Sequence, residues 1–179
     1  MRIEYDASLT GLAAGVSVYD PVTGQFALRA YAAVPVPFPS NSDPSFQNTC
    51  EFLAIPLGLL LAHHLHLRAF RYHLLGDSVS SLAWASKGRV SSERARRASV
   101  VFSLLTMHLQ ALLALTTHVP GVDNGVYDGL SRNMTPTLQV ALPQHLGSLL
   151  TLCNPSLAIS SPEDHLTLSA STFTILRDN

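Results

Sequence analysis

Residues 117–132 read THVPGVDNGVYDGLSR, and this stretch sets the interpretation of the whole chain. Its Asp128 follows Asn124 by four residues and His118 by ten. Three further acidic residues stand where the chain is expected to enter or leave its strands and helices: Asp6, Glu51 and Asp77. Carboxylates gathered at one place repel one another unless cations lie between them. Such a group is typical of a site that holds divalent metal for phosphoryl chemistry.

The composition is that of a folded domain. The chain has 179 residues, of which 47% are hydrophobic and only 13% are charged, and this excludes a disordered chain. The formal net charge of -1 gives no overall attraction to nucleic acid. A surface that binds nucleic acid must therefore come from the local arrangement of basic residues.

The cysteines indicate a reducing compartment, and the most apolar segment does not indicate a membrane span. Cys50 and Cys153 form no CxxC pattern and suit a reducing environment, so we expect an intracellular protein of the cytoplasm or nucleus. The apolar segment 52–62 is interrupted by Pro56 and Gly58 and is too short to span a bilayer. We expect it to form a core helix, with no membrane as partner.

The order of elements predicts an α/β fold. Three antiparallel strands are expected first, then a proline-rich loop and an alternation of helices and strands. The expected strands are 2–8, 12–19, 25–34, 69–76 and about 114–119. The expected helices run from a cap at Asn48 or Thr49 to about 67, from 78 to about 86, from a cap at Ser91 or Ser92 to about 113, and onward from about 124. This order predicts a mixed five-stranded sheet with helices on both faces.

Residues 1–133 are expected to form this domain. Prolines divide residues 134–179, for which we expect short helices near 144–152 and after Ser161-Pro162-Glu163. We interpret this segment as an appendage that packs on the domain or on a missing partner.

With one acid on the first strand, one on the first helix, one after the fourth strand and one on the last helix, this order resembles the ribonuclease H fold. The flanking residues are also similar to that family: Asp6-Ala7-Ser8 before Gly11 and Gly15, NTCEFLA at 48–54, and Gly76-Asp77-Ser78. The run from His118 to Arg132 looks most like the ribonuclease H domain of retrotransposon reverse transcriptases, and 76–84 resembles its Ty3-like and DIRS-like forms. The resemblance covers about 1–133.

The resemblance implies an activity and assigns residues to it. The protein would hydrolyse the RNA strand of RNA/DNA hybrids with two Mg²⁺ or Mn²⁺ ions, roughly 4 Å apart, and a reverse transcriptase polymerase domain is an implied partner. The metal-holding and catalytic acids would be Asp6, Glu51, Asp77 and Asp128. His118, on a loop near the site, would assist proton movement or product release. The substrate-binding residues would be Ser8, Asn48, Ser78 and Asn124.

Five of the eleven Lys and Arg residues fall between Lys87 and Arg97. A basic helix start is opposed by the helix dipole, so this run favours a local anionic partner, and we expect Arg94, Arg96 and Arg97 to bind the hybrid. The alternative is a solvated helix face.

Two rival functions stay open. One is a catalytically idle scaffold or interaction domain within a larger reverse transcriptase or protein assembly. The other is a nuclease of the same fold that acts on DNA. The exonuclease branch usually carries Asp-x-Glu where this chain has Asp6-Ala7-Ser8, and the integrase branch ends in Glu rather than Asp128. Two departures from the family's pattern, Gly125 and Tyr127, bear on the helix that presents Asp128.

Overall fold

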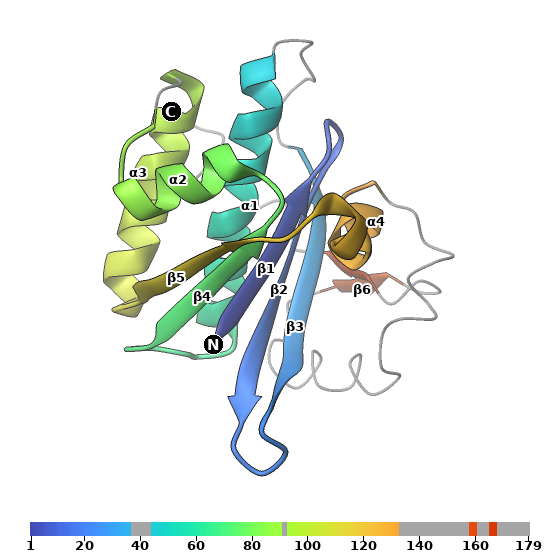
Figure 1. The fold of residues 1–179 in the computed structure, drawn as a ribbon, viewed down its shortest axis with the longest axis vertical. Helices are drawn as coiled ribbons and strands as arrows, with labels where there is room; N and C mark the ends of the chain where they lie inside the picture. The colour runs from blue at the N-terminus through green and yellow to red at the C-terminus, as the bar shows by residue number, and fades with distance from the viewer. Residues whose placement is uncertain (37–43, 91–92, 133–157, 161–164, 168–179) are drawn as a thin grey trace.

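A five-stranded mixed sheet organises the chain (Figure 1). The computed structural model describes residues 1–36, 44–90, 93–132, 158–160 and 165–167. The sheet has the order β3-β2-β1-β4-β5, in which β1 pairs antiparallel with β2 and parallel with β4. Its strands are β1 (Arg2–Ala7), β2 (Gly11–Asp20), β3 (Gln25–Pro35), β4 (Arg71–Gly76) and β5 (Leu112–His118). The predicted mixed sheet with three antiparallel strands first is confirmed.

Helices cover both faces of this sheet, as predicted. The helices are α1 (Pro44–His64), α2 (Val79–Lys87), α3 (Glu93–Leu109) and α4 (Gly125–Ser131), with a 3-10 turn η1 (Gly121–Asp123) before α4. Ile3 meets Gly58 of α1, whereas the next residue, Glu4, meets Tyr127 of α4. Since neighbouring strand residues point to opposite faces, α1 and α4 lie on opposite sides of β1 (Figure 1).

The first helix begins earlier than predicted. It starts at Pro44 rather than after a cap at Asn48 or Thr49, and proline is well suited to a first helical position because its missing N–H has no partner there. Glu51 therefore lies inside α1 and not in its first turn. The helix dipole therefore does not account for this acid.

The third helix ends earlier than predicted. It ends at Leu109, and Gln110 adopts a left-handed conformation with φ of 52°. That conformation stops the helix and lets β5 begin at Leu112. The predicted helix to about 113 is wrong here.

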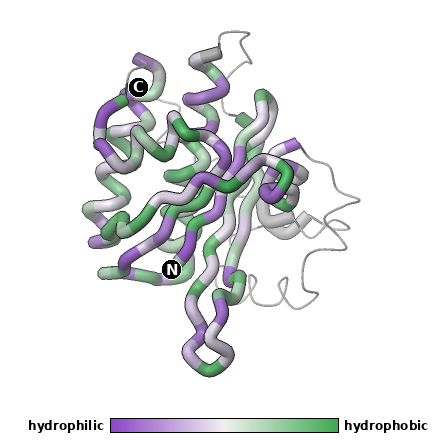
Figure 2. Tube along the Cα trace, in the orientation of Figure 1, coloured by the Kyte–Doolittle hydropathy of each residue, from purple (hydrophilic) through white to green (hydrophobic). Residues whose placement is uncertain are grey.

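The core lies between the sheet and α1. Tyr5, Tyr31 and Tyr72 of the sheet and Phe52 of α1 are almost completely buried. Residues 52–62 are buried throughout, as expected of a core helix. Figure 2 shows hydrophobic residues distributed along the helices and along the strands of the sheet. None of the helices in the described residues has both the length and the hydropathy needed to cross a bilayer.

Two short strands follow the main sheet in sequence. β6 (Ala158–Ser160) and β7 (His165–Thr167) pair antiparallel, and β7 contacts β3. The helix predicted after Ser161-Pro162-Glu163 is wrong at 165–167, where the chain forms a strand. The helix predicted near 144–152 lies outside the described residues, and the domain boundary at 133 stays a prediction.

Candidate metal centre

Three acidic side chains meet at one edge of the sheet. Asp6 lies near the end of β1, Asp77 directly follows β4, and Glu51 reaches them from α1. The carboxyl ends of the parallel strands β1 and β4 meet at this edge, which brings the two aspartates together. One carboxylate oxygen of each residue lies within 4.8 Å of the others. We call these residues the acidic trio.

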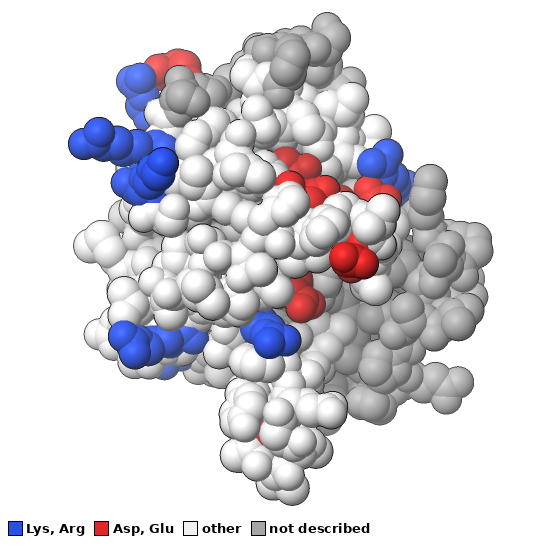
Figure 3. All heavy atoms as spheres, viewed as in Figure 1, with Lys and Arg blue, Asp and Glu red and all other residues white. Residues whose placement is uncertain are grey.

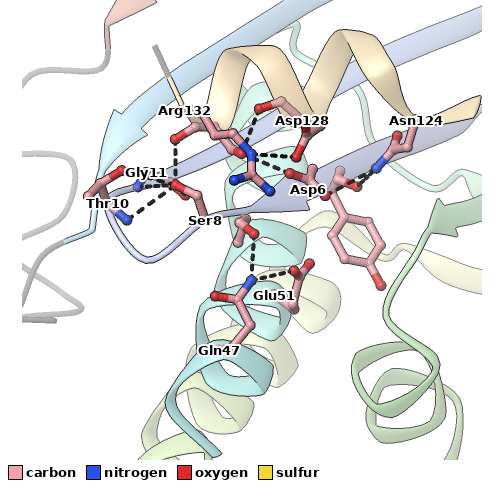
Figure 4. A network of polar contacts seen from close by, with 12 residues as sticks. Asp6, Ser8, Thr10, Gly11, Gln47, Glu51, Asn124, Asp128 and Arg132 are labelled. Carbon is pink, nitrogen blue, oxygen red and sulfur yellow. Dashed lines mark hydrogen bonds and ion pairs between the residues drawn. The ribbon is translucent and has the colours of Figure 1, made fainter. Parts of the chain in front are cut away.

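Two oxygens of the acidic trio have no hydrogen-bond donor among the residues that the structure describes. Gln47 donates from Nε2 to Oε1 of Glu51 at 2.8 Å and to the carbonyl oxygen of Ala7 at 2.6 Å, which holds the Glu51 side chain in place (Figure 4). Glu51 Oε2 and Asp77 Oδ1 are buried and accept no hydrogen bond within the described residues. Buried polar atoms are normally satisfied, so two orphaned carboxylate oxygens in one cluster fit a cation. Carboxylates suit the hard ions Mg²⁺ and Mn²⁺.

Burial and mutual repulsion disfavour the charged forms of Glu51 and Asp6. Asp6 is 2% exposed and Glu51 is 5% exposed. Burial raises the pKa of Glu51 to about 9, and the neighbouring Asp6 and Asp77 carboxylates contribute to this rise. Burial likewise raises the pKa of Asp6 to about 6, although the hydrogen bond from Ser131 opposes this shift. A divalent cation would reverse the balance, because it favours the ionised carboxylates.

Helix α4 orients Asp6. Asn124 donates from Nδ2 to Asp6 Oδ1 at 3.2 Å and to the Tyr5 carbonyl oxygen at 3.2 Å. Ser131 donates from Oγ to Asp6 Oδ2 at 2.8 Å. Both oxygens of Asp6 are thus held by donors from the two ends of one short helix. The sequence analysis named Asn124 only as a substrate-binding residue and missed Ser131, whose only signal was its place in the motif that ends at Arg132.

Asp128 lies beside the acidic trio but is not one of its three members. Its Oδ1 accepts a hydrogen bond of 2.7 Å from Nε of Arg132, one turn later in the chain, and the two side chains form an ion pair (Figure 4). The Asp128 and Arg132 side chains are 41% and 52% exposed. Asp128 is still close enough to raise the pKa of Asp6. The sequence therefore placed the fourth acid near the site, but it did not reveal the arginine that binds it.

The departure at Tyr127 has a structural explanation. Its hydroxyl donates to Glu4 Oε2 at 3.0 Å and lies over Gly15, where a side chain would collide with it. The phenol therefore fills space that β2 leaves open, and it ties α4 to the sheet. Gly125 begins α4, and none of the residues described by the structure has an atom near the position that a Cβ would take there.

The expected substrate-binding residues lie in different settings. The Ser8 hydroxyl is engaged within the protein, since it donates to the Ser131 carbonyl oxygen at 2.7 Å and accepts from the Gly11 N–H at 2.9 Å. Ser78 caps α2 by accepting from the Ser81 N–H at 3.2 Å. Asn48 is half-buried in α1, one turn before Glu51.

His118 is far from Asp77 in the sequence, but the fold places it at the end of the neighbouring strand. It is exposed and is the last residue of β5, which confirms the predicted strand at about 114–119 and not the loop that the resemblance implied. It pairs in register with Gly76, the residue before Asp77. The imidazole is therefore carried by the strand end next to the one that delivers Asp77.

The basic run lies apart from the acids. Lys87 and Arg89 are exposed near the end of α2, and Arg96 and Arg97 are exposed on α3. Arg94 belongs to α3, but its side chain lies outside the described residues. Figure 3 shows basic side chains gathered over the end of α2 and the start of α3, separate from a central group of acidic side chains. Arg96 also pairs with Glu93 at 2.9 Å, and both side chains are largely exposed.

Known structures with the same arrangement are ribonuclease H domains. The ribonuclease H1 of the halophilic archaeon Halobacterium salinarum matches with a TM-score of 0.55 and 19% identity over 74% of this chain and 97% of that one. The N-terminal ribonuclease H domain of a Mycobacterium tuberculosis protein matches with a TM-score of 0.53 and 15% identity, over 74% and 98%. The LC11 ribonuclease H1, solved in complex with an RNA/DNA hybrid, gives 0.54 and 15%, over 74% and 94%.

No protein-family model and no curated protein matches the sequence. The likeness is therefore one of three-dimensional structure, and it agrees with the strand order and with helices on both faces. The chain adopts the ribonuclease H fold.

Proposed function

We propose that this protein is a metal-dependent endonuclease that hydrolyses the RNA strand of RNA/DNA hybrids. The observation that carries the proposal is the acidic trio beside the carboxyl ends of the adjacent parallel strands β1 and β4. One oxygen each of Glu51 and Asp77 has no hydrogen-bond partner in the described part of the chain. The similarity of the fold to a ribonuclease H1 that was solved with a hybrid supports the same substrate class.

Asp6, Glu51 and Asp77 would hold the first of two Mg²⁺ or Mn²⁺ ions, and Asp128 would contribute to the second. Bound there, the ions supply an activated water and stabilise the leaving 3′-oxygen of the phosphodiester. Gln47 keeps one oxygen of Glu51 occupied, so the other stays available to a ligand.

The remaining residues would bind the substrate and transfer protons. His118 is exposed beside the end of β4, where an imidazole can accept or donate a proton near the cleaved bond. Asn48 and Ser78 lie near Glu51 and Asp77 in sequence and would contact the hybrid. Ser8 and Asn124 would also contact it if they exchange their hydrogen bonds within the protein for hydrogen bonds to the hybrid.

The basic surface would hold the other part of the hybrid. Arg96 and Arg97 are exposed and can reach phosphates, and Arg94 lies on the same helix start. An exposed pair such as Arg96 with Glu93 contributes little to stability, so Arg96 can leave it at small cost.

Within the ribonucleases H, we propose that this protein is of the retroelement type. This assignment rests on the motif of residues 118–132 and on 76–84, and it implies a reverse transcriptase polymerase domain as partner within the cell. Joining the two activities in one assembly would let the nuclease remove the RNA template after it has been copied.

A substrate panel tests the proposal. We expect the purified protein with Mg²⁺ or Mn²⁺ to cut the RNA strand of a labelled RNA/DNA hybrid, and to leave duplex DNA and duplex RNA intact. Cleavage of duplex DNA instead would support the DNA-directed alternative.

One observation favours the scaffold alternative. Asp128 is already neutralised by Arg132, as an acid without a metal to bind would be. A folded protein that cuts none of the three duplexes at any metal concentration would support the scaffold.

A further inference from the structure

The ion pair between Asp128 and Arg132 places a fixed cation at the rim of the acidic trio. Arg132 caps the end of α4, and its backbone N–H donates to the Asp128 carbonyl oxygen at 3.2 Å. Its side chain folds back along the same turn, so that Nε reaches Asp128 Oδ1 at 2.7 Å (Figure 4). Both the backbone and the side chain of Arg132 are therefore directed to the fourth acid.

The end of α4 also contacts the acidic trio directly. Ser131, the residue before Arg132, donates from Oγ to Asp6 Oδ2 at 2.8 Å. Arg132 therefore follows directly on a residue that binds a member of the trio. One positive charge from the protein thus already compensates this edge of the site.

The two halves of the site consequently differ. Glu51 and Asp77 have buried oxygens that no donor in the described part of the chain satisfies, and these residues come from α1 and from the end of β4. Asp128 comes from α4, is half-exposed and has a partner at ion-pair distance. A divalent ion that approaches Asp128 must displace the guanidinium or remain close to it, and like charges at such distances repel.

We propose that Arg132 is an internal counter-cation that competes with the second metal ion for Asp128. This inference rests on the proposed function. The acidic trio binds one ion without involving Arg132. The second ion binds more weakly because Arg132 must first release Asp128. A guanidinium is well suited to this exchange, since it binds phosphate as readily as carboxylate and can turn from Asp128 to an incoming phosphodiester.

Titration with Mn²⁺ tests the inference on the whole chain without substrate. The free ion is followed by electron paramagnetic resonance, which counts the ions bound to the protein. For the wild-type protein we expect one ion of higher affinity and a second of lower affinity. Arg132→Gln should tighten the second ion by about fivefold to tenfold, as expected for loss of one competing ion pair, and leave the first within about twofold.

Two further variants separate the possible roles of Arg132. Arg132→Lys keeps the positive charge and should retain most of the competition. Arg89→Gln removes an exposed charge in the segment between α2 and α3 and should leave both affinities unchanged. Circular dichroism checks that each variant is folded.

The outcomes distinguish this inference from the proposed function. Binding of two Mn²⁺ ions with the same second affinity in wild type and Arg132→Gln overturns the counter-cation role but leaves the metal site standing. A weaker second ion in Arg132→Gln also overturns it, because Arg132 would then be positioning Asp128 for the metal. A folded protein that binds no Mn²⁺ overturns both.

Discussion

The phenol oxygen of Tyr127 lies where a side chain at Gly15 would be, so that a Cβ built on Gly15 would collide with it. This close approach joins α4, which carries Asp128 and Ser131, to the centre of the sheet. The same hydroxyl donates to Glu4 Oε2 at 3.0 Å, so close packing is combined with a hydrogen bond. The helix that completes the site is therefore positioned from its buried side.

Gly15→Ala is expected to displace α4. The added methyl group collides with a ring that is almost fully buried, and overpacking of this kind costs about 1–3 kcal/mol. Chemical denaturation measures the loss. Gly125→Ala is the matched control, since nothing lies within 4 Å of a Cβ there and alanine favours helix, so its stability should be equal or slightly higher. Equal stability of wild type and Gly15→Ala would contradict the packing.

The metal-free protein is expected to lose stability as pH rises. The pKa of Glu51 is about 9 and that of Asp6 about 6 in the folded chain, against about 4.3 and 3.9 in an unfolded one. The folded state therefore holds more protons. Its extra stability is complete below about pH 4 and declines as pH rises to about 9, by at most about 1.4 kcal/mol per pH unit for each proton.

Thermal unfolding with a chelator present, from pH 7 to pH 9, measures this decline, because burial lowers the pKa of His63, His64 and His73 and these groups oppose the decline at lower pH. Glu51→Gln cannot ionise and should show a shallower slope than wild type. A wild-type melting temperature that rises over this range would contradict the assigned burial of charge.

Divalent metal is expected to restore the stability lost at high pH. An ion that binds only the folded state adds about 2.7 kcal/mol at one hundred times its dissociation constant. The rise in melting temperature on adding Mg²⁺ or Mn²⁺ should be larger at pH 8 than at pH 6, because bound metal requires ionised carboxylates. Asp77→Asn should remove most of the rise. A rise of the same size in that variant would show that the ion binds elsewhere.

Ser131→Ala is expected to weaken metal binding in a pH-dependent way. Its hydrogen bond to Asp6 lowers the pKa of that carboxyl, so loss of the hydroxyl raises the pKa and leaves Asp6 protonated over a wider range. We expect Mn²⁺ affinity to fall by about threefold to tenfold at pH 6 and by less at pH 8. Ser103→Ala, on the exposed side of α3, is the control. A loss that does not vary with pH would indicate a general structural effect.

Neutralising the basic surface is expected to reduce affinity for the hybrid. The triple variant of Arg94, Arg96 and Arg97 to Gln should bind more weakly at low salt. Its plot of log affinity against log salt should be shallower, by a slope of about one for each phosphate that the protein no longer neutralises. Arg71→Gln, at the opposite end of β4 from Asp77, is the control. An unchanged slope in the triple variant would make these arginines a solvated helix face.

The fold was predictable because its signals are local. Turn residues between the first strands and the alternation of later elements indicated the mixed sheet, and β1 and β4 then bring Asp6 and Asp77 to one edge. Helix limits were less predictable. Asn48 resembles a cap but Pro44 begins α1, and Gln110 ends α3 through a left-handed conformation that its residue type does not announce.

The details of the site depend on interactions between distant parts of the chain. Ser131 bonds to Asp6 across 125 residues, and Gln47 reaches Ala7 across 40. Neither residue type indicates these partners. The acids could be identified from the sequence, whereas the groups that orient them required the fold.

Cleavage of the RNA strand of a hybrid by a matched pair of variants tests the central claim most directly. Asp77→Asn removes a member of the acidic trio, whereas Asp123→Asn removes an exposed acid of η1, outside the trio. With Mg²⁺ or Mn²⁺, we predict cleavage by wild type and Asp123→Asn, and a loss of at least about a hundredfold in rate for folded Asp77→Asn. Equal cleavage by both variants, or none by the folded wild-type protein with metal bound, would contradict the account.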